Sequence, residues 1–313
     1  MKNLCFALGF VVAVGCGTDR QLGPDTLPNL TVPPAPAPNA GFQVITPIFE
    51  NVMPGGDYEV CTWTDQILAH DVDIRSTLGY QTEPPGHHVI MYYTTVRQPP
   101  NTQRVCNDSD MATFRFLAGG AGEGETTQAP GNLVFHAPAG AQIVINHHYL
   151  NTTDRVLRGQ SVINANYADP NGSYIHNGYV AIVNTNLQIP VGDQTQTMHA
   201  VIDQTYKAWS IIPHMHQWGK HTTITITQSG NAMKQFDLDW DPSYTFHPPK
   251  NTWDVTAPML LQPGDMIDVS CEWNNTTSNV LTFGPEMCVS FLNTIDDQNL
   301  GSRAWDDGSW VPF

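Results

Sequence analysis

Apolar and polar residues alternate along much of this chain, in short stretches with a period of two. Successive side chains on a β-strand point to opposite faces, so this pattern predicts half-buried strands. No stretch combines a sustained helical period with capping residues. The clearest alternating stretches are residues 58–63, 88–95, 142–149, 179–184, 208–212, 222–227, 266–273 and 287–292.

Turn-forming residues separate these stretches, as in PGG at 54–56 and QPGD at 262–265. The cluster DPNG at 169–172 lies near the midpoint of the chain and is the best candidate for a domain boundary. We therefore expect an all-β protein. Its architecture would be two consecutive antiparallel β-sandwich domains of jelly-roll type, residues 42–172 and 173–313, with a cleft between them.

The first 16 residues resemble an export signal. Lys2 precedes an apolar stretch, residues 4–14, that is too short to cross a bilayer as a helix. The stretch ends in AVGC at 13–16, which resembles a bacterial lipobox, so we expect Cys16 to carry a lipid; signal cleavage without a lipid is the alternative. A Pro-rich linker, residues 17–41, follows. The predicted location is the bacterial cell envelope, in the outer membrane or periplasm, or outside the cell if no lipid is attached.

The charge balance limits the partners. The chain has 13 Lys and Arg against 29 Asp and Glu, a net charge of −16, which argues against binding to nucleic acid. No other apolar stretch is long enough to span a membrane, so we expect membrane contact only through the N-terminal lipid. No sequence pattern indicates an oligomeric state.

Four cysteines remain once the two in the N-terminal segment are set aside. An even number in an exported chain predicts two disulfides rather than four free thiols. Three pairings are possible, and pairing neighbours along the chain would keep one bridge in each half. The four residues are Cys61, Cys106, Cys271 and Cys288.

Candidate metal ligands are concentrated in four short segments. They are GHHVIMY at 86–92, NHHY at 146–149, HMHQWGK at 214–220 and PEMC at 285–288. The set combines imidazoles with a thioether, a soft ligand that suits copper, especially Cu(I), better than zinc. The other histidines have no ligand partner at a suitable spacing, and we expect them to be structural: His70, His136, His176, His199, His221 and His247.

Spacing decides which of these residues can share an ion. Neighbours on a strand point to opposite faces, so His87 and His88 can bind one ion only where the strand begins or bulges. The preceding PPG at 84–86 supplies such an irregular backbone. His214 and His216 are two residues apart, and on a strand that ends at WG, 218–219, they would share a face.

The last segment is the least specific when it is taken alone. Met287 would more often be a packing residue than a ligand. Glu286 would more often be a hydrogen-bonded or solvated carboxylate than a metal ligand. Only the joint order of the four segments changes this interpretation.

That order and spacing resembles the copper type II, ascorbate-dependent monooxygenases, the family of peptidylglycine α-hydroxylating monooxygenase and dopamine β-monooxygenase. The resemblance covers residues 42–300. It implies two coppers per chain, with His147 as a strand neighbour and not a ligand. The implied ligands are His87, His88 and His148 for an electron-transfer copper, and His214, His216 and Met287 for an oxygen-activating copper. The implied disulfides are Cys61–Cys106 and Cys271–Cys288.

The resemblance also implies an activity. Members of the family use O₂ and a reductant such as ascorbate to hydroxylate a C–H bond of a small organic substrate. The peptide-amidating members hold a substrate carboxylate with an Arg, an Asn and a Tyr. Ile212, Val289 and Phe291 occupy those positions here and offer no charge or hydrogen bond. We therefore do not expect a glycine-extended peptide as the substrate.

Two other functions compete with this one. The missing carboxylate clamp and the acidic surface would also fit a lipid-anchored copper-binding or copper-handling protein without turnover. A zinc hydrolase has less support, because no carboxylate base lies at motif spacing and methionine is a poor zinc ligand.

Overall fold

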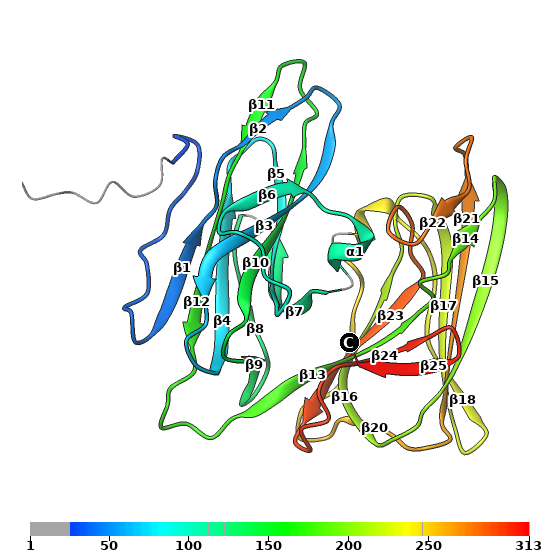
Figure 1. Cartoon of the computed structure of the whole chain (residues 1–313). Coiled ribbons are helices and arrows are strands. Elements are labelled where there is room, and N and C mark those ends of the chain that lie inside the picture. The colour runs from blue at the N-terminus through cyan, green and yellow to red at the C-terminus, as the bar shows by residue number, and fades with distance from the viewer. Residues whose placement is uncertain (1–25, 112, 122, 246, 313) are drawn as a thin grey trace, which may run out of the picture.

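A computed structural model of the chain describes residues 26–111, 113–121, 123–245 and 247–312 (Figure 1). The predicted export signal with Cys16, and the first part of the predicted linker, lie outside these residues. In the described part, regular structure is almost entirely strand, apart from the short helix α1 (Asp108–Met111) and a 3-10 turn at Pro242–Thr245. None of the helices described there is long and apolar enough to cross a bilayer. The all-β fold class is confirmed.

All eight stretches with clear alternation form strands. The ends agree within four residues. One difference concerns a candidate ligand, because β23 begins at Val289 and Met287 therefore precedes the strand. The eight strands are β3 (Asp57–Ile67), β5 (Gly86–Thr94), β10 (Gln142–Leu150), β13 (Ile175–Val183), β16 (Tyr206–His214), β17 (Gly219–Gln228), β21 (Met266–Asn275) and β23 (Val289–Asp296).

Two facing sheets form the N-terminal half, at the left of Figure 1. One contains, in order, β1 (Gly41–Ile45), β12 (Ser161–Tyr167), β4 (Val72–Gln81) and β9 (Leu133–Ala137), with β8 (Glu123–Gln128) also paired to β4. The other has the order β6 (Thr102–Val105), β3, β10, β5 and β7 (Arg115–Ala121). Ile74 and Ile163 from the first sheet and Met91 and Ile145 from the second share one buried apolar core. A small sheet of β2 (Phe49–Val52) and β11 (Leu157–Gly159) lies beside them.

The C-terminal half has the same sandwich-type arrangement. One layer contains β13, β23, β16 and β19 (Asn251–Thr252), with β20 (Met259–Leu261), β24 (Arg303–Asp306) and β25 (Ser309–Pro312) attached. The other has the order β15 (Gly192–Val201), β21, β17 and β18 (Asn231–Asp239). Ile182 and Leu292 pack against Ile226 and Val269 across a second, separate core. A short pair, β14 (Gln188–Ile189) and β22 (Leu281–Thr282), completes this half.

The largest sheet is continuous across the middle of the chain. β9 and β13 pair in parallel at two positions, Leu133 with Ile175 and Val134 with His176. β13 also pairs in parallel with β24, whereas the other strand pairs of this sheet are antiparallel. The 169–172 segment forms a turn before β13, closed by the bond from the Gly172 amide to the Asp169 carbonyl (2.8 Å). The division into two domains at this turn, and the cleft between them, stay predictions.

Part of the predicted linker packs on the sandwich. Leu27 is 8% exposed, and its backbone amide donates to Gln160 Oε1 (2.9 Å). Asn164 Nδ2 donates to the carbonyl of Pro34 (2.9 Å), which fixes the Pro-rich stretch beside β12. Residues 26–40 therefore belong to the folded surface.

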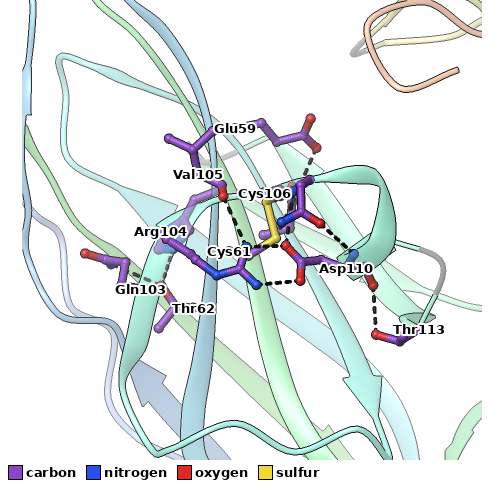
Figure 2. The surroundings of a disulfide bond; sticks show 12 residues. Glu59, Cys61, Thr62, Gln103, Arg104, Val105, Cys106, Asp110 and Thr113 are labelled. Atoms are coloured by element: carbon purple, nitrogen blue, oxygen red, sulfur yellow. Dashed lines mark hydrogen bonds and ion pairs between the residues drawn. A yellow bond between two sulfur atoms is a disulfide. The ribbon is translucent and has the colours of Figure 1, made fainter. Parts of the chain in front are cut away.

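Both disulfides join neighbours along the chain, so the predicted pairing is confirmed. Cys61 on β3 bonds to Cys106 just after β6, and Arg104 forms an ion pair with Asp110 beside this bridge (Figure 2). Cys271 on β21 bonds to Cys288, which lies just before β23. The second bridge therefore ties the two facing sheets of the C-terminal half together, next to the segment that carries Met287.

Candidate metal centres

Three imidazoles converge between β5 and β10. The candidate ligand atoms of His87, His88 and His148 all lie within 4.8 Å of one another. Their ring centroids are 5.0 Å (His87 to His148), 5.1 Å (His88 to His148) and 5.8 Å (His87 to His88) apart. The Nδ1 atoms of all three are buried. We call these residues the three-histidine cluster, and its donor set fits a single copper ion.

A β-bulge explains how two adjacent histidines reach one site. In the pairing of β10 with β5, His148 lies opposite His88, and Tyr149 lies opposite Gly86. His87 is therefore the extra residue of β5. An extra residue interrupts the strict alternation of side chains, so neighbouring imidazoles can point into the same space. The sequence had predicted this irregular backbone.

The two histidines of β10 have different surroundings. His147 is fully buried, with Nε2 2.7 Å from Thr62 Oγ1 and Nδ1 2.9 Å from Ser161 Oγ. Burial lowers the pKa of His147 to about 3, so the ring is neutral and bonded to hydroxyl groups. His147 lies outside the three-histidine cluster, in agreement with its exclusion from the ligand set.

Asp57, at the start of β3, holds His148 in place. Its carboxylate accepts a hydrogen bond from His148 Nε2, so Nδ1 is the ring nitrogen that carries the lone pair. This bond is the main reason that the pKa of Asp57 lies below its ordinary value. Carboxylates commonly orient metal-binding imidazoles in this way. Sequence spacing does not reveal Asp57, because the contact depends on the register of β3 with β10.

The electrostatics of the cluster favour neutral ligands. Burial, and next the charge of His148, hold the pKa of His88 well below its ordinary value. Two histidines of the C-terminal half, His247 and His214, lower this pKa further through their charges. His247 also places its ring centroid 6.2 Å from that of His87. His247 was expected to be structural, but it lies beside the cluster.

A second pair of imidazoles lies in the C-terminal half. The Nε2 atoms of His214 and His216 are 3.1 Å apart. Burial, with the nearby charge of His216, lowers the pKa of His214 to about 3, which leaves a neutral imidazole. One expectation needs correction, because β16 ends at His214 and His216 lies in the following turn. Burial still alternates beyond the strand end, because Met215 is buried between the two half-buried histidines.

Glu286 fixes that turn. Its carboxylate is completely buried and accepts hydrogen bonds from three backbone amides. The Oε1 atom is 2.6 Å from the His216 amide and 2.9 Å from the Met287 amide, and Oε2 is 3.1 Å from the Trp218 amide. Glu286 is thus a hydrogen-bonded group, as expected, and it couples the segment of His216 to the segment of Met287.

Met287 is close to the histidine pair along the backbone. The register of β16 with β23 ends with His214 opposite Val289. Beyond the strand ends, Oε1 of Glu286 accepts hydrogen bonds from the amides of both His216 and Met287. The half-buried Met287 side chain packs against a small apolar cluster that includes Val183 and Val289. Its assignment as a copper ligand stays a prediction.

Apolar side chains lie beside the histidine pair. Ile212 lies opposite Phe291 in the β16–β23 register, and the Phe291 ring centroid is 6.0 Å from that of His214. The surface that β16 and β23 form beside the histidine pair is therefore apolar.

A further group was missed by sequence spacing. Asp73, His136 and His176 have candidate ligand atoms within 4.8 Å of one another, although no pair of them is close in the chain. His136 and His176 were expected to be structural residues without ligand partners. Strand pairing assembles this group, and no local motif could have revealed it.

Comparisons with known proteins add little to this picture. No protein-family model and no curated protein sequence matches the chain. Among solved structures, that of infectious bursal disease virus strain Gx is 12% identical over 86% of this chain and 76% of the other, with a TM-score of 0.20. That of a T=1 Penaeus vannamei nodavirus is 10% identical over 82% and 91%, with a TM-score of 0.18. TM-scores this low carry no argument about fold or function.

Proposed function

We propose that this protein is a copper-dependent monooxygenase that uses O₂ and a small reductant such as ascorbate to hydroxylate a C–H bond of a small organic substrate. The observation that carries the proposal is the convergence of His87, His88 and His148, together with the separate pair His214 and His216. Three imidazoles suit a copper that stores an electron, and two imidazoles near a thioether suit Cu(I).

The residues present fit two coppers of different character. His87, His88 and His148 would hold one ion, and His214, His216 and Met287 the other. Copper, when bound, supplies one-electron transfer and activation of O₂. Asp57 would keep His148 in the tautomer whose Nδ1 can bind metal, through the hydrogen bond at Nε2.

Burial contributes to both sets. The neutral rings of His88 and His214 offer lone pairs without first losing a proton. Glu286 would hold His216 and Met287 at a constant separation through its bonds to their amides. Such support limits the movement of the ligands during a change of oxidation state.

The apolar strand surface limits the substrate class. Ile212 and Phe291 offer no partner to a carboxylate, so we propose a substrate with an aliphatic or benzylic C–H bond and no carboxylate at that position.

Metal analysis of variants tests the proposal. The purified chain is reconstituted with copper, and copper per chain is measured for wild type, His87→Ala/His88→Ala, and His214→Ala. Each variant is expected to bind one copper fewer than wild type. Equal copper content in all three would contradict the two-centre model.

Met287→Ile tests the assigned role of the thioether. This variant is expected to keep the copper of the three-histidine cluster and to lose ascorbate-dependent hydroxylation. Met233→Ile is a matched control, because Met233 lies on β18 and packs against the core of the C-terminal half. Full activity of Met287→Ile would show that the role assigned to Met287 is wrong.

The alternative is a copper-binding or copper-handling protein without turnover, and the apolar pair of Ile212 and Phe291 in place of a carboxylate clamp favours it. A library of amines and arylalkyl compounds, incubated with copper-loaded protein, O₂ and ascorbate, separates the two functions. Product formation coupled to O₂ uptake from any compound excludes a pure binding protein.

A further inference from the structure

A carboxylate and two imidazoles meet where the two halves of the chain join. His136 Nδ1 is 2.9 Å from Asp73 Oδ1, and His176 Nε2 is 3.2 Å from the same oxygen. The imidazole rings stack with centroids 4.2 Å apart and an angle of 24° between their planes. The three side chains are between 31% and 38% exposed, so an ion in solvent can reach them.

Strand pairing positions all three residues. Asp73 on β4 lies directly opposite His136 on β9. His176, near the start of β13, pairs with Val134 on the other edge of β9. One face of three neighbouring strands therefore presents a carboxylate and two imidazoles. The residues that carry them lie in paired strands and not in a loop.

The separations are close to those around a metal ion. Ligand atoms bonded to a tetrahedral zinc at about 2.0–2.1 Å lie about 3.3 Å from one another. The two distances to Asp73 Oδ1 are within a few tenths of an ångström of this value. We propose that Asp73, His136 and His176 form a third metal site, which binds Zn²⁺ or a similar borderline divalent cation. This site does not depend on the proposed monooxygenase function.

The donor set indicates the class of ion. Two imidazoles and one carboxylate suit Zn²⁺, whereas Mg²⁺ and Ca²⁺ prefer sites made only of oxygen ligands. Asp71 adds a second negative charge that acts on His136. His136 also lines a cavity of about 30 Å³, which is large enough for a water molecule as a further ligand. Arg115 lines the same cavity, and its positive charge acts against the binding of a cation.

A metal here would fasten the junction of the halves. β9 and β13 pair at only two positions, and His176 is one of the residues in that pairing. Asp73 and His136 come from the N-terminal half, whereas His176 follows the turn at 169–172. An ion bound by all three would add a cross-link to a strand pairing of only two positions, which is the hydrogen-bonded connection between the two halves of the continuous sheet.

Zinc binding by matched variants tests the site. The purified full chain is dialysed against micromolar Zn²⁺, and zinc per chain is measured for wild type, His176→Gln and Asp73→Asn. Each variant is expected to bind one zinc fewer than wild type. The control is His199→Gln, which removes a histidine that also contacts a carboxylate, Asp268 (2.7 Å), but without a third ligand in that contact. It is expected to bind as much zinc as wild type.

Equal zinc content in wild type and His176→Gln would overturn the proposal, as would an equal loss in His199→Gln. Circular dichroism of each variant tests whether it is folded. If His176→Gln is not folded, the zinc content of Asp73→Asn decides the outcome. The cross-link has its own measurement, which is hydrogen exchange of residues 133–137 and 175–180 with and without Zn²⁺. Exchange is expected to slow at least threefold in wild type and to be unchanged in His176→Gln. No slowing in wild type would overturn the cross-link.

Discussion

Glu286 shows, at the scale of the residue, how a buried carboxylate can position candidate metal ligands without being one of them. It receives three backbone N–H groups, and each of these would otherwise be left without a partner in a buried turn. The charge of the carboxylate strengthens these bonds. The position of His216 relative to Met287 therefore depends on a side chain that need not contact copper.

Glu286→Gln is expected to be destabilising and to weaken the second centre. The amide nitrogen that replaces one oxygen is a donor and faces backbone donors, so at least one bond is lost. We expect the free energy of unfolding in urea to fall by about 3 kcal/mol, the cost of lost charge-assisted hydrogen bonds in a buried site. Copper affinity of the His214 and His216 pair should fall as well. The control is Glu272→Gln at an exposed position on β21; an equal effect of the two substitutions would contradict this role.

Substitutions of the two adjacent histidines of β10 are expected to affect different properties, stability for His147 and copper binding for His148. His147→Leu removes one partner of the Thr62 hydroxyl and one partner of the Ser161 hydroxyl inside the core. It should cost about 2 kcal/mol of stability and leave copper binding by the folded protein intact. His148→Ala should remove the copper of the three-histidine cluster. Urea unfolding and copper analysis of the two variants check this, and copper loss in folded His147→Leu would contradict it.

At the scale of the element, alternation in the sequence predicts the strands well, because one face of each strand is buried. It does not predict the register. A shift of one residue would turn His87 or His148 away from the cluster, and only the contacts between strands determine that shift. The H-x-H spacing correctly pairs His214 with His216, although the strand ends at His214 and not beyond His216. Asp57 and His247 are missed because their contacts join distant parts of the chain.

The pairing of β17 with β18 contains a histidine with acidic partners at both nitrogens. His221 Nδ1 is 2.9 Å from Asp239 Oδ1, and Nε2 is 2.9 Å from Asp237 Oδ1. Both nitrogens donate only when the ring is protonated. The hydrogen bonds to Asp239 and Asp237, with Glu272 nearby, raise the pKa of His221 above its ordinary value of 6.5. Lys234 Nζ also donates to Asp237, at the other carboxylate oxygen.

This pair of strands is therefore expected to lose stability as the pH rises. A raised pKa in the folded state stabilises the fold fully below the unfolded value, and this contribution disappears as the pH rises through the folded value. In metal-free protein, the free energy of unfolding of wild type should fall relative to that of His221→Gln as the pH rises above 6.5, the ordinary pKa of histidine. Urea unfolding at several pH values measures the difference, which solvent will keep small. Parallel pH profiles for the two proteins would contradict the role of His221.

At the scale of the whole molecule, the net charge of −16 affects any anionic co-substrate. If the proposed function is right, the ascorbate anion approaches a surface of like charge. The second-order rate of copper reduction by ascorbate should then rise with NaCl, because salt screens the repulsion. Stopped-flow reduction at about 0.01 M and 0.15 M ionic strength measures this effect. An uncharged hydroquinone is the control and should show little change; a fall in the ascorbate rate with salt would contradict repulsion.

The sheet shared by the two halves determines how the gene can be divided. If the chain were cut near residue 172, the N-terminal fragment would lack β13, the neighbour of β9. In the C-terminal fragment, the first residues of β13 would form an exposed edge. Exposed strand edges recruit other strands, so each half produced alone would tend to aggregate. The same edges are complementary, and two fragments produced in one cell would have a specific surface through which to reassemble. The molecule is thus better suited to split-protein complementation than to use as two independent modules.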